Sequence, residues 1–484
     1  MKAKNGLSLL LIHLITLVSF GQDYHYWTDQ FGIKATALGG AAISGQDDHS
    51  MVYYNAAAMS LITNPSLSFS INAYQYRIFK RENALGPGRN LSSSDFATVP
   101  NMMAGIFIPK KAPKWRLGYH VVSRNVYNNK VDLFHSGKYD VLQLPGEETF
   151  VSTYADEIHN SEYWSGIAAA YQLTPHLSVG ITHMGVYKST KYYNYYSFSV
   201  LPPDTSSSEV TRLSSTMSFN YWDVKILFKP SVLIQYPKFR AGLTVTLPSI
   251  NIIGRGNFYR EFSTLNLHDV LPIDFAVISK VTNDKVTHRT ATSIALGISA
   301  RLSPKLWFHI SAETFFKRSY YLIHQGSETT EHYPEIIPDS LISSIFGNER
   351  FLSYGEAYKA VTNVGVGLDF QINQQLSLQG GAHTDYNYNQ YPVYQFSRQV
   401  VEAGQYDRLV TSVGGNYTLK SGKRIALAFE FGFSLPKTTA YTVDFTTPNE
   451  IRNGLTGDPG YGAKTSAYSY KLMFELTLGK LTNK

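Results

Sequence analysis

The chain has 484 residues, of which 43% are hydrophobic, 14% aromatic and only 16% charged, with a net charge of +7 and no cysteine. Charged residues make up about 25% of an ordinary globular domain, so this sequence is poor in charge. It contains no block of Lys or Arg of the length that nucleic-acid binding uses, which excludes that class of partner. A chain rich in tyrosine, poor in charge and free of long apolar runs is typical of an exported β-barrel.

The N-terminus predicts a secretory signal peptide over residues 1–21. Lys2 and Lys4 precede an apolar run from Leu7 to Phe20, and a small residue, Gly21, follows it. The run is shorter than the roughly 20 residues that a transmembrane helix needs. We therefore expect the mature chain to begin at Gln22 and to leave the cytoplasm.

Residues 22–65 predict a compact segment that packs inside another structure. The stretch "ALGGAAISG" at 37–45 shows no clear period, and a polar group follows it. Glycine and alanine allow backbones to approach closely, while Asp48 and Asn55 offer hydrogen bonds. The candidate site residues of this segment are Gly39, Gly40, Asp48, Ser50, Tyr54, Asn55 and Ala56.

From Ser66 onward the chain consists of paired runs that alternate apolar and polar residues. Gly and Pro mark tight turns, which is the signal of β-hairpins. The predicted turns lie at 111–113, 174–176, 237–238, 303–305, 372–375 and 421–422. These six hairpins give twelve strands, and the runs that start at Leu67 and Ser466 bring the total to fourteen.

The connections between the hairpins are predicted to be long and polar. They cover roughly 80–98, 127–162, 191–218, 251–289, 318–361, 389–406 and 435–464. Short turns that alternate with long connections, and an even number of strands, indicate an all-β fold. We predict a 14-stranded antiparallel transmembrane β-barrel over residues 66–484, which is wide enough to hold a small plug domain.

The final strand shows the pattern of a wall strand. Tyr470, Leu472 and Phe474 share one face, and Lys471 and Glu475 share the other, because side chains alternate across a strand. The same alternation points charged residues of several other strands inward. The inward set is Arg301, Glu313, Asp369, Glu430, Lys471 and Glu475. We therefore expect a polar, hydrated lumen that is too wide for side chains alone to fill.

Residues 24–76 resemble the FadL/TodX family of outer-membrane transporters for long-chain fatty acids and other hydrophobic compounds. The motifs that carry the resemblance are Leu38-Gly39-Gly40-Ala41-Ala42, Asp48, Ser50, Tyr53-Tyr54 and Asn55-Ala56-Ala57-Ala58-Met59. Hairpin segments such as "FRAGLTVTLPS" and "NQQLSLQGGAHTDY" are similar to family strands, and the start at Trp27 resembles Bacteroidetes-type sequences. The chain departs from the family where Ala56 replaces a proline and Ala58 a glycine.

The resemblance implies a fold in which residues 22–65 form a hatch inside the lumen of the 14-stranded barrel. It also implies a function. Hydrophobic ligands would bind at the outer loops, pass to an internal apolar pocket and leave sideways through a gap at a kinked strand. That strand corresponds to residues 115–125, and the stretch "VVSRNVYNN" at 121–129 lacks the Pro or Gly that would mark a kink. A ligand carboxylate needs a cation, and Lys225, Arg301 and Lys471 are the inward candidates. No cofactor, metal or catalysis is expected.

The expected location is the outer membrane of a Gram-negative bacterium, in contact with outer-membrane lipid and lipopolysaccharide. Passive uptake of a hydrophobic small molecule is the leading hypothesis. Some Bacteroidetes members of the family serve type IX secretion, so a barrel that binds a secreted protein or a translocon is the alternative function.

Other interpretations of single motifs remain open beside these. Asp47-Asp48-His49 lacks a convincing metal-ligand spacing, and Ser50 with His49, His309 or His383 lacks a nucleophile elbow. Hydrogen bonding within the hatch is favoured over both.

Four further segments have ordinary interpretations. The acidic segment 144–164 is expected as a solvated loop in preference to a Ca²⁺ site, and Arg124-Asn125 as loop or strand-end residues. Tyr192 to Tyr196 and the pair Tyr468 and Tyr470 are expected as aromatic girdles at the membrane interface in preference to a ligand path.

Overall fold

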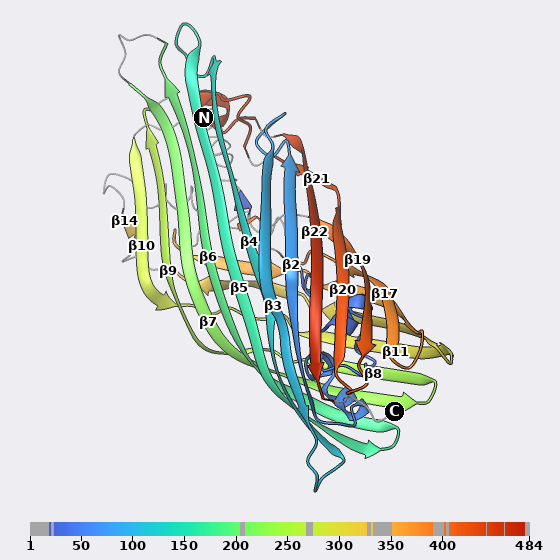
Figure 1. The fold of residues 1–484 in the computed structure, drawn as a ribbon. Helices are drawn as coiled ribbons and strands as arrows, with labels where there is room; N and C mark the ends of the chain where they lie inside the picture. Colours follow the sequence, from blue (N-terminus) through green and yellow to red (C-terminus); the bar gives the residue numbers. More distant parts are fainter. Residues whose placement is uncertain are drawn as a thin grey trace.

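The computed structural model describes residues 19–20, 24–203, 209–267, 274–326, 331–332, 351–390, 401–402, 406–441, 443–458 and 460–479. Within them the chain forms a closed antiparallel β-barrel of 14 strands (Figure 1), as predicted. The expected cleavage after Gly21 lies outside the described residues. No helix in the described part of the chain has the length and apolar character needed to cross a membrane.

The strands of the barrel wall lie side by side in the order in which they occur in the chain. The first six strands are β2 (Ser66–Glu82), β3 (Leu91–Phe107), β4 (Trp115–Tyr139), β5 (Glu148–Thr174), β6 (Leu177–Leu201) and β7 (Thr211–Tyr236). The next two wall strands are each interrupted once, as β8 (Phe239–Thr246) with β9 (Ile250–Leu265), and β10 (Phe275–Lys285) with β11 (Ser293–Ser303). The last six are β12 (Leu306–Phe315), β16 (Val361–Gln371), β17 (Leu376–Asp385), β19 (Asp407–Thr418), β20 (Arg424–Leu435) and β22 (Tyr461–Leu478), which pairs with β2.

Shorter elements complete the described structure. They are β1 (Ser19–Phe20), β13 (Arg318–His324), β14 (Glu331–His332), β15 (Tyr354–Tyr358), β18 (Val401–Glu402), β21 (Lys437–Ala440) and the helix α5 (Glu450–Asn453). The six predicted tight turns are all present between the wall strands that they were expected to join.

The predicted long connections are wrong in extent. Residues 127–162 were expected as one connection, yet β4 and β5 pair from Trp115 with Tyr171 to Tyr139 with Glu148, with one register shift between Ser123 and Asn125. The acidic segment 144–164, expected as a solvated loop, therefore lies mostly in β5. Beyond the lipid both faces of a strand can be polar, so the apolar alternation that identifies a strand fades while the backbone ladder continues. Figure 1 shows these long strands rising on one side of the barrel.

The wall is apolar outside and polar inside. In β22, Tyr470, Leu472 and Phe474 are exposed, whereas Lys471 and Glu475 are buried. A soluble protein buries its apolar side chains, so exposure of this face requires a hydrocarbon environment. The alternation predicted from the sequence is confirmed, and it identifies a barrel whose outer surface faces lipid.

The segment 24–65, called the hatch below, lies in the lumen. It contains α2 (Ile33–Ala37), α3 (Met51–Tyr54) and the 3₁₀ helix η1 (Ala56–Leu61). α2 contacts β17, β19, β20 and β22, while η1 contacts β4, β5, β6 and β7, so the hatch reaches opposite sides of the wall. In Figure 1 it lies inside the end of the barrel that carries the short turns.

Two local features shape the hatch. Gly39 and Gly40 follow α2 with φ of 61° and 71°, a left-handed conformation that favours glycine. Asn55 is extended, with φ of −155°, and Ala56 opens η1. The first position of a helix accepts proline readily, and proline favours an extended residue before it. Position 56 is therefore one that a proline could also occupy, and Ala56 fills it here.

Candidate functional site

Inward-facing glycines of the wall let the hatch backbone lie directly against the strands. A Cβ added at Gly242 would lie 2.0 Å from the carbonyl oxygen of Ile43, and one at Gly365 would lie 2.1 Å from that of Gly39. Comparably close approaches occur at Gly180, Gly297, Gly367, Gly381 and Gly414. Larger residues at these positions would hold the hatch away from the wall. The glycines therefore determine how close the hatch lies to the strands.

An ion pair joins the hatch to β16. The Nζ of Lys34 lies 2.9 Å from Oδ2 of Asp369 and also contacts Asp47. The Lys34 ammonium holds the pKa of the Asp47 carboxyl well below its usual range. A charged pair that is buried and mutually satisfied resists separation, because each partner left alone would be an uncompensated charge.

Two further cations tie the hatch to β20 and β22. The Nη2 of Arg424 lies 3.1 Å from Oδ2 of Asp48 and 3.3 Å from Oε1 of Glu475. The Nζ of Lys471 lies 2.7 Å from Oδ1 of Asp29. Asp48 therefore joins the hatch to a cation of the wall.

Hydrogen bonds hold the hatch internally. The Tyr54 hydroxyl donates to Oε1 of Gln30 at 2.8 Å. The side-chain amide of Asn55 donates to the carbonyl oxygens of Ile43 at 2.7 Å and of Val232 at 3.2 Å. Asn55 thus joins two parts of the hatch to β7, and its side chain is fully buried.

Asp48 and His49 of the catalytic and metal alternatives have hydrogen-bond partners, whereas the Ser50 hydroxyl is buried without one in the described structure. Oδ1 of Asp48 accepts a hydrogen bond from the Ser50 backbone at 2.8 Å, and Nε2 of His49 lies 2.9 Å from Oγ of Ser66. Burial is the main cause that lowers the pKa of His49 to about 4, so this imidazole is neutral at pH 7.

The other two candidate histidines lie on the wall. Nδ1 of His309 lies 2.6 Å from Oγ of Ser299, and the His383 ring packs edge-on against Trp27 at a ring-centre distance of 5.8 Å. Each histidine therefore has its own neighbours, and the geometry brings none of them to Ser50.

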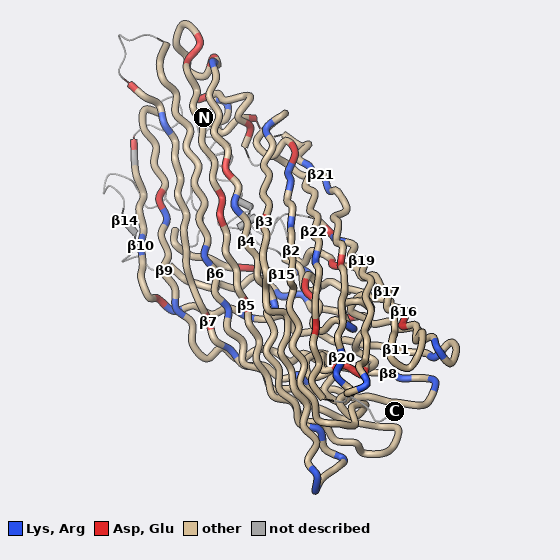
Figure 2. The backbone as a smooth tube through the Cα atoms, in the orientation of Figure 1, with Lys and Arg blue, Asp and Glu red and all other residues tan. Residues whose placement is uncertain are grey.

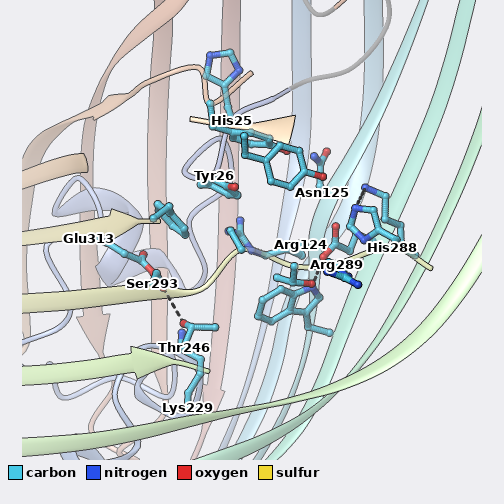
Figure 3. Close-up of a pocket in the computed structure, with 18 of the residues that line it drawn as sticks. His25, Tyr26, Arg124, Asn125, Lys229, Thr246, His288, Arg289, Ser293 and Glu313 are labelled. Atoms are coloured by element: carbon cyan, nitrogen blue, oxygen red, sulfur yellow. Dashed lines mark hydrogen bonds between the residues drawn. The ribbon is translucent and has the colours of Figure 1, made fainter. Parts of the chain in front are cut away.

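A cavity lies on the outer side of the hatch. It encloses about 650 Å³ of empty space, part of it open to solvent. Figure 3 shows side chains from the hatch, the wall strands and the connection after β10 around this space. Its aromatic lining includes Tyr26, Tyr53, Trp164, Phe315, Tyr358 and Tyr388. Its charged lining includes Arg124, Glu162, Lys188, Lys229, Arg289 and Glu313.

A bulge in β4 brings two polar side chains into the cavity. The register with β5 shifts between Ser123 and Asn125, and both Arg124 and Asn125 line the space. A bulge re-aims a side chain that strict alternation would place elsewhere. The strand expected to carry a kink therefore carries a bulge. The prediction of loop or strand-end residues at Arg124-Asn125 is wrong, because both lie in the interior of β4.

Several polar atoms that line this cavity are buried without a hydrogen-bond partner in the described structure. They are the hydroxyl of Tyr26, Nε of Arg124, Oδ1 of Asn125 and Oγ1 of Thr290. Buried polar groups are normally paired, so unpaired ones need an explanation. Lys229 is buried too, and its Nζ lies 4.3 Å from the Tyr53 ring centre. These groups are positioned to meet a ligand or water.

The three predicted carboxylate partners have different surroundings. Lys225 is buried and contacts Asp223 at 2.9 Å and Nδ1 of His288 at 2.6 Å. Lys471 is buried in ion pairs that involve the hatch. Arg301 is exposed near a short turn, where its side chain donates to the Pro304 carbonyl oxygen.

Sequence reasoning therefore missed Arg124 and Lys229. Lys229 lies on the same face of β7 as Lys225, so alternation already placed it inward. The tyrosines at 192 and 196, expected in a girdle, are buried in β6 and face the lumen, while Tyr468 and Tyr470 are exposed as a girdle requires.

The wall has a window between β3 and β4. The two strands pair only from Met102 with Val122 to Phe107 with Leu117. Farther out, the ladder stops, and the backbone N–H of Lys130 donates to Oγ of Ser93 at 3.4 Å. The window is therefore bounded at both ends.

A second cavity, with about 400 Å³ of empty space, lies at the window. Residues of both strands that border the window line it, including Asp95 of β3 and Tyr127 of β4. Arg77 of β2 also lines it and donates from Nη1 to the carbonyl oxygen of Val126 at 2.7 Å. The exposed rings of Tyr74 and Phe96 lie on the outside of the adjoining strands, with ring centres 6.0 Å apart.

Comparison with solved structures shows what this architecture is similar to. A FadL homologue of Pseudomonas aeruginosa gives a TM-score of 0.58 at 10% identity, over 94% of this chain and 99% of that one. The toluene transporter TodX of Pseudomonas putida gives 0.53 at 13% identity, over 95% and 99%. TbuX of Ralstonia pickettii, also a toluene transporter, gives 0.53 at 12%, over 93% and 99%.

No family model and no curated protein matches the chain. At identities this low, the likeness to solved structures shows a FadL-like barrel fold.

Proposed function

We propose that the chain is an outer-membrane transport protein for the passive uptake of hydrophobic small molecules. The observation that carries this proposal is the geometry of the lumen. The hatch fills the end with the short turns, and an aromatic-lined cavity lies on its outer side. A window with its own cavity opens between β3 and β4. A molecule that moved from the lumen to this window would reach the bilayer without passing the hatch.

The fold supports the same proposal. The barrels that share it carry names that identify toluene transporters and a FadL homologue. Apolar molecules dissolve in the bilayer core, so a sideways route through the window avoids a second aqueous compartment. Long-chain fatty acids belong to the proposed substrate class because they combine an apolar chain with a carboxylate.

The cavity also supports a role for an anionic group on the ligand. Arg124 has a buried Nε without a partner, and the Lys229 ammonium faces a ring instead of a carboxylate. A carboxylate placed between these two cations would give charge-assisted hydrogen bonds to both. Arg124 and Lys229 therefore replace Lys225, Arg301 and Lys471 as the proposed carboxylate partners.

We expect the double substitution Arg124→Gln and Lys229→Met to reduce the uptake of a fluorescent long-chain fatty acid about 10-fold or more. A charged hydrogen bond contributes about 1.5–3 kcal/mol. Uptake into proteoliposomes that contain the full-length protein measures this change. Toluene has no charge, so its permeation should stay unchanged. Arg301→Gln, exposed near a turn, serves as the matched control. Equal uptake by the double variant and the wild type would contradict the assignment.

The window makes a separate prediction. Ala97 lies on β3 within the window, where the strand has left its ladder with β4. Ala97→Trp should obstruct the opening and reduce the transport of both the fatty acid and toluene several-fold. Ala169→Trp adds the same ring to β5, whose neighbours are paired on both sides, and should have no effect. Normal transport by Ala97→Trp would exclude the window as the route.

The alternative function, a secretion partner that binds a secreted protein or a translocon, stays a prediction from the resemblance. Deletion of the gene distinguishes the two, because loss of growth on a hydrophobic substrate with intact secretion supports uptake.

A further inference from the structure

The end of the barrel that carries the short turns is basic. None of the turn segments 108–114, 174–176, 237–238, 303–305, 372–375 and 419–423 contains Asp or Glu. Exposed cations lie in four of these turns or within two residues of them. This set, the basic rim, is Lys110, Lys111, Lys114, Lys238, Arg301, Lys305, Lys420 and Lys423. Figure 2 shows Lys and Arg at the tips of short turns.

The basic rim lies immediately beyond the lipid-facing surface. Phe107 and Trp115 are 58% and 42% exposed and flank the three lysines of the first turn. Tyr236 and Phe239, 50% and 40% exposed, flank Lys238. Exposed aromatic rings of this kind mark the level of the lipid headgroups. Lysine and arginine side chains extend from that level toward the phosphates.

The rim charges have no acidic partner within the described residues. The nearest acidic side chain of the hatch that is partly exposed at this end, Asp47, is paired with Lys34. The rim side chains that do form hydrogen bonds donate to carbonyl oxygens, as Arg301 does to Pro304 and Lys305 to Ile372. The positive charge is therefore free to attract an anionic partner.

The positions of the rim cations around the barrel indicate the shape of the partner that they can bind. Its cations come from the turns β3–β4, β7–β8, β11–β12 and β19–β20, which are spread around a closed barrel. A folded protein that docks on one side would meet only part of such a ring. A lipid leaflet surrounds the barrel and meets all of it at one depth.

We propose that the basic rim binds the phosphate groups of anionic phospholipids in the leaflet at the short-turn end. Phosphatidylglycerol is the simplest lipid of this class. The binding would fix the depth and tilt of the barrel, and it would anchor the β3–β4 hairpin that borders the window. This inference is independent of which compound the barrel transports.

Trp115 provides a local probe of lipid binding next to Lys110, Lys111 and Lys114. The full-length protein is reconstituted in bilayers that contain brominated phosphatidylglycerol or brominated phosphatidylcholine at equal mole fractions. Bromine quenches tryptophan on contact, and subtraction of the Trp115→Phe signal isolates this residue from the other tryptophans. We expect a relative binding constant about threefold or more in favour of the anionic lipid, because each nearby cation contributes attraction.

Removal of the charges should remove the preference. The variant with Lys110→Gln, Lys111→Gln and Lys114→Gln should give a ratio near one, and so should the wild type in high salt. Lys130→Gln with Lys138→Gln, on the outer part of the same strand, should leave the ratio unchanged. Heat-modifiable migration on a gel verifies that each variant forms the barrel. A wild-type ratio near one, or an unchanged ratio in the triple variant, would overturn the proposal.

Discussion

Gly381→Ala is expected to destabilise the protein by about 3 kcal/mol, the upper part of the range for overpacking, while Gly380→Ala is nearly neutral. A Cβ at Gly381 would lie 2.3 Å from the carbonyl carbon of Leu38 and 2.4 Å from the backbone N of Gly39. Both are backbone atoms, so no side chain can rotate away. A Cβ at Gly380 would have its nearest neighbour, the Ser412 carbonyl oxygen, at 3.9 Å.

The two glycines make a matched pair, since they are adjacent on β17 and differ in the face they present. Urea unfolding of the full-length protein in detergent micelles measures the difference in stability. Planar-bilayer conductance supplies a second measurement, because a hatch displaced by Gly381→Ala should let ions pass and Gly380→Ala should not. Equal stability and conductance for the two variants would show that the hatch does not press against β17.

The wall of the barrel could be predicted from the sequence because lipid imposes a strict alternation on it. In β22, Leu472 and Phe474 face hydrocarbon, whereas Lys471 and Glu475 face the lumen. The sequence of this single strand therefore alternates between apolar and charged residues. Outside the bilayer this demand disappears. The outer half of β4, with Asn128, Lys130 and Asp132 on its outward face, carries no apolar alternation, and its strand character could not be predicted.

The cavity was harder to predict for two physical reasons. The bulge between Ser123 and Asn125 changes which residues face inward, and no Gly or Pro marks it. Alternation also gives a side chain's face but not its height relative to the hatch. Lys225 and Lys229 point inward alike, yet Lys225 pairs with Asp223 and Lys229 faces the Tyr53 ring at the cavity. Only the folded hatch decides which of the two lines the space.

Arg424→Met is expected to destabilise the protein by about 3–5 kcal/mol, the usual cost of breaking a buried ion pair. The guanidinium lies 3.1 Å from Asp48 and 3.3 Å from Glu475, and all three residues are buried. Its removal leaves two carboxylates close together without a cation. Since Asp48 belongs to the hatch and Glu475 to the wall, their repulsion acts on the contact that holds the hatch.

Further variants distinguish the loss of the guanidinium's attraction from the repulsion between the two carboxylates that remain. Addition of Asp48→Asn and Glu475→Gln to Arg424→Met should recover most of the lost stability, because amides can stay buried without a counter-charge. Arg424→Lys keeps the charge but offers a single ammonium in place of the fork, so its loss should be intermediate. If the triple variant is no more stable than Arg424→Met in urea unfolding, the buried charges are not what destabilises it, and the guanidinium acts through packing and hydrogen bonds alone.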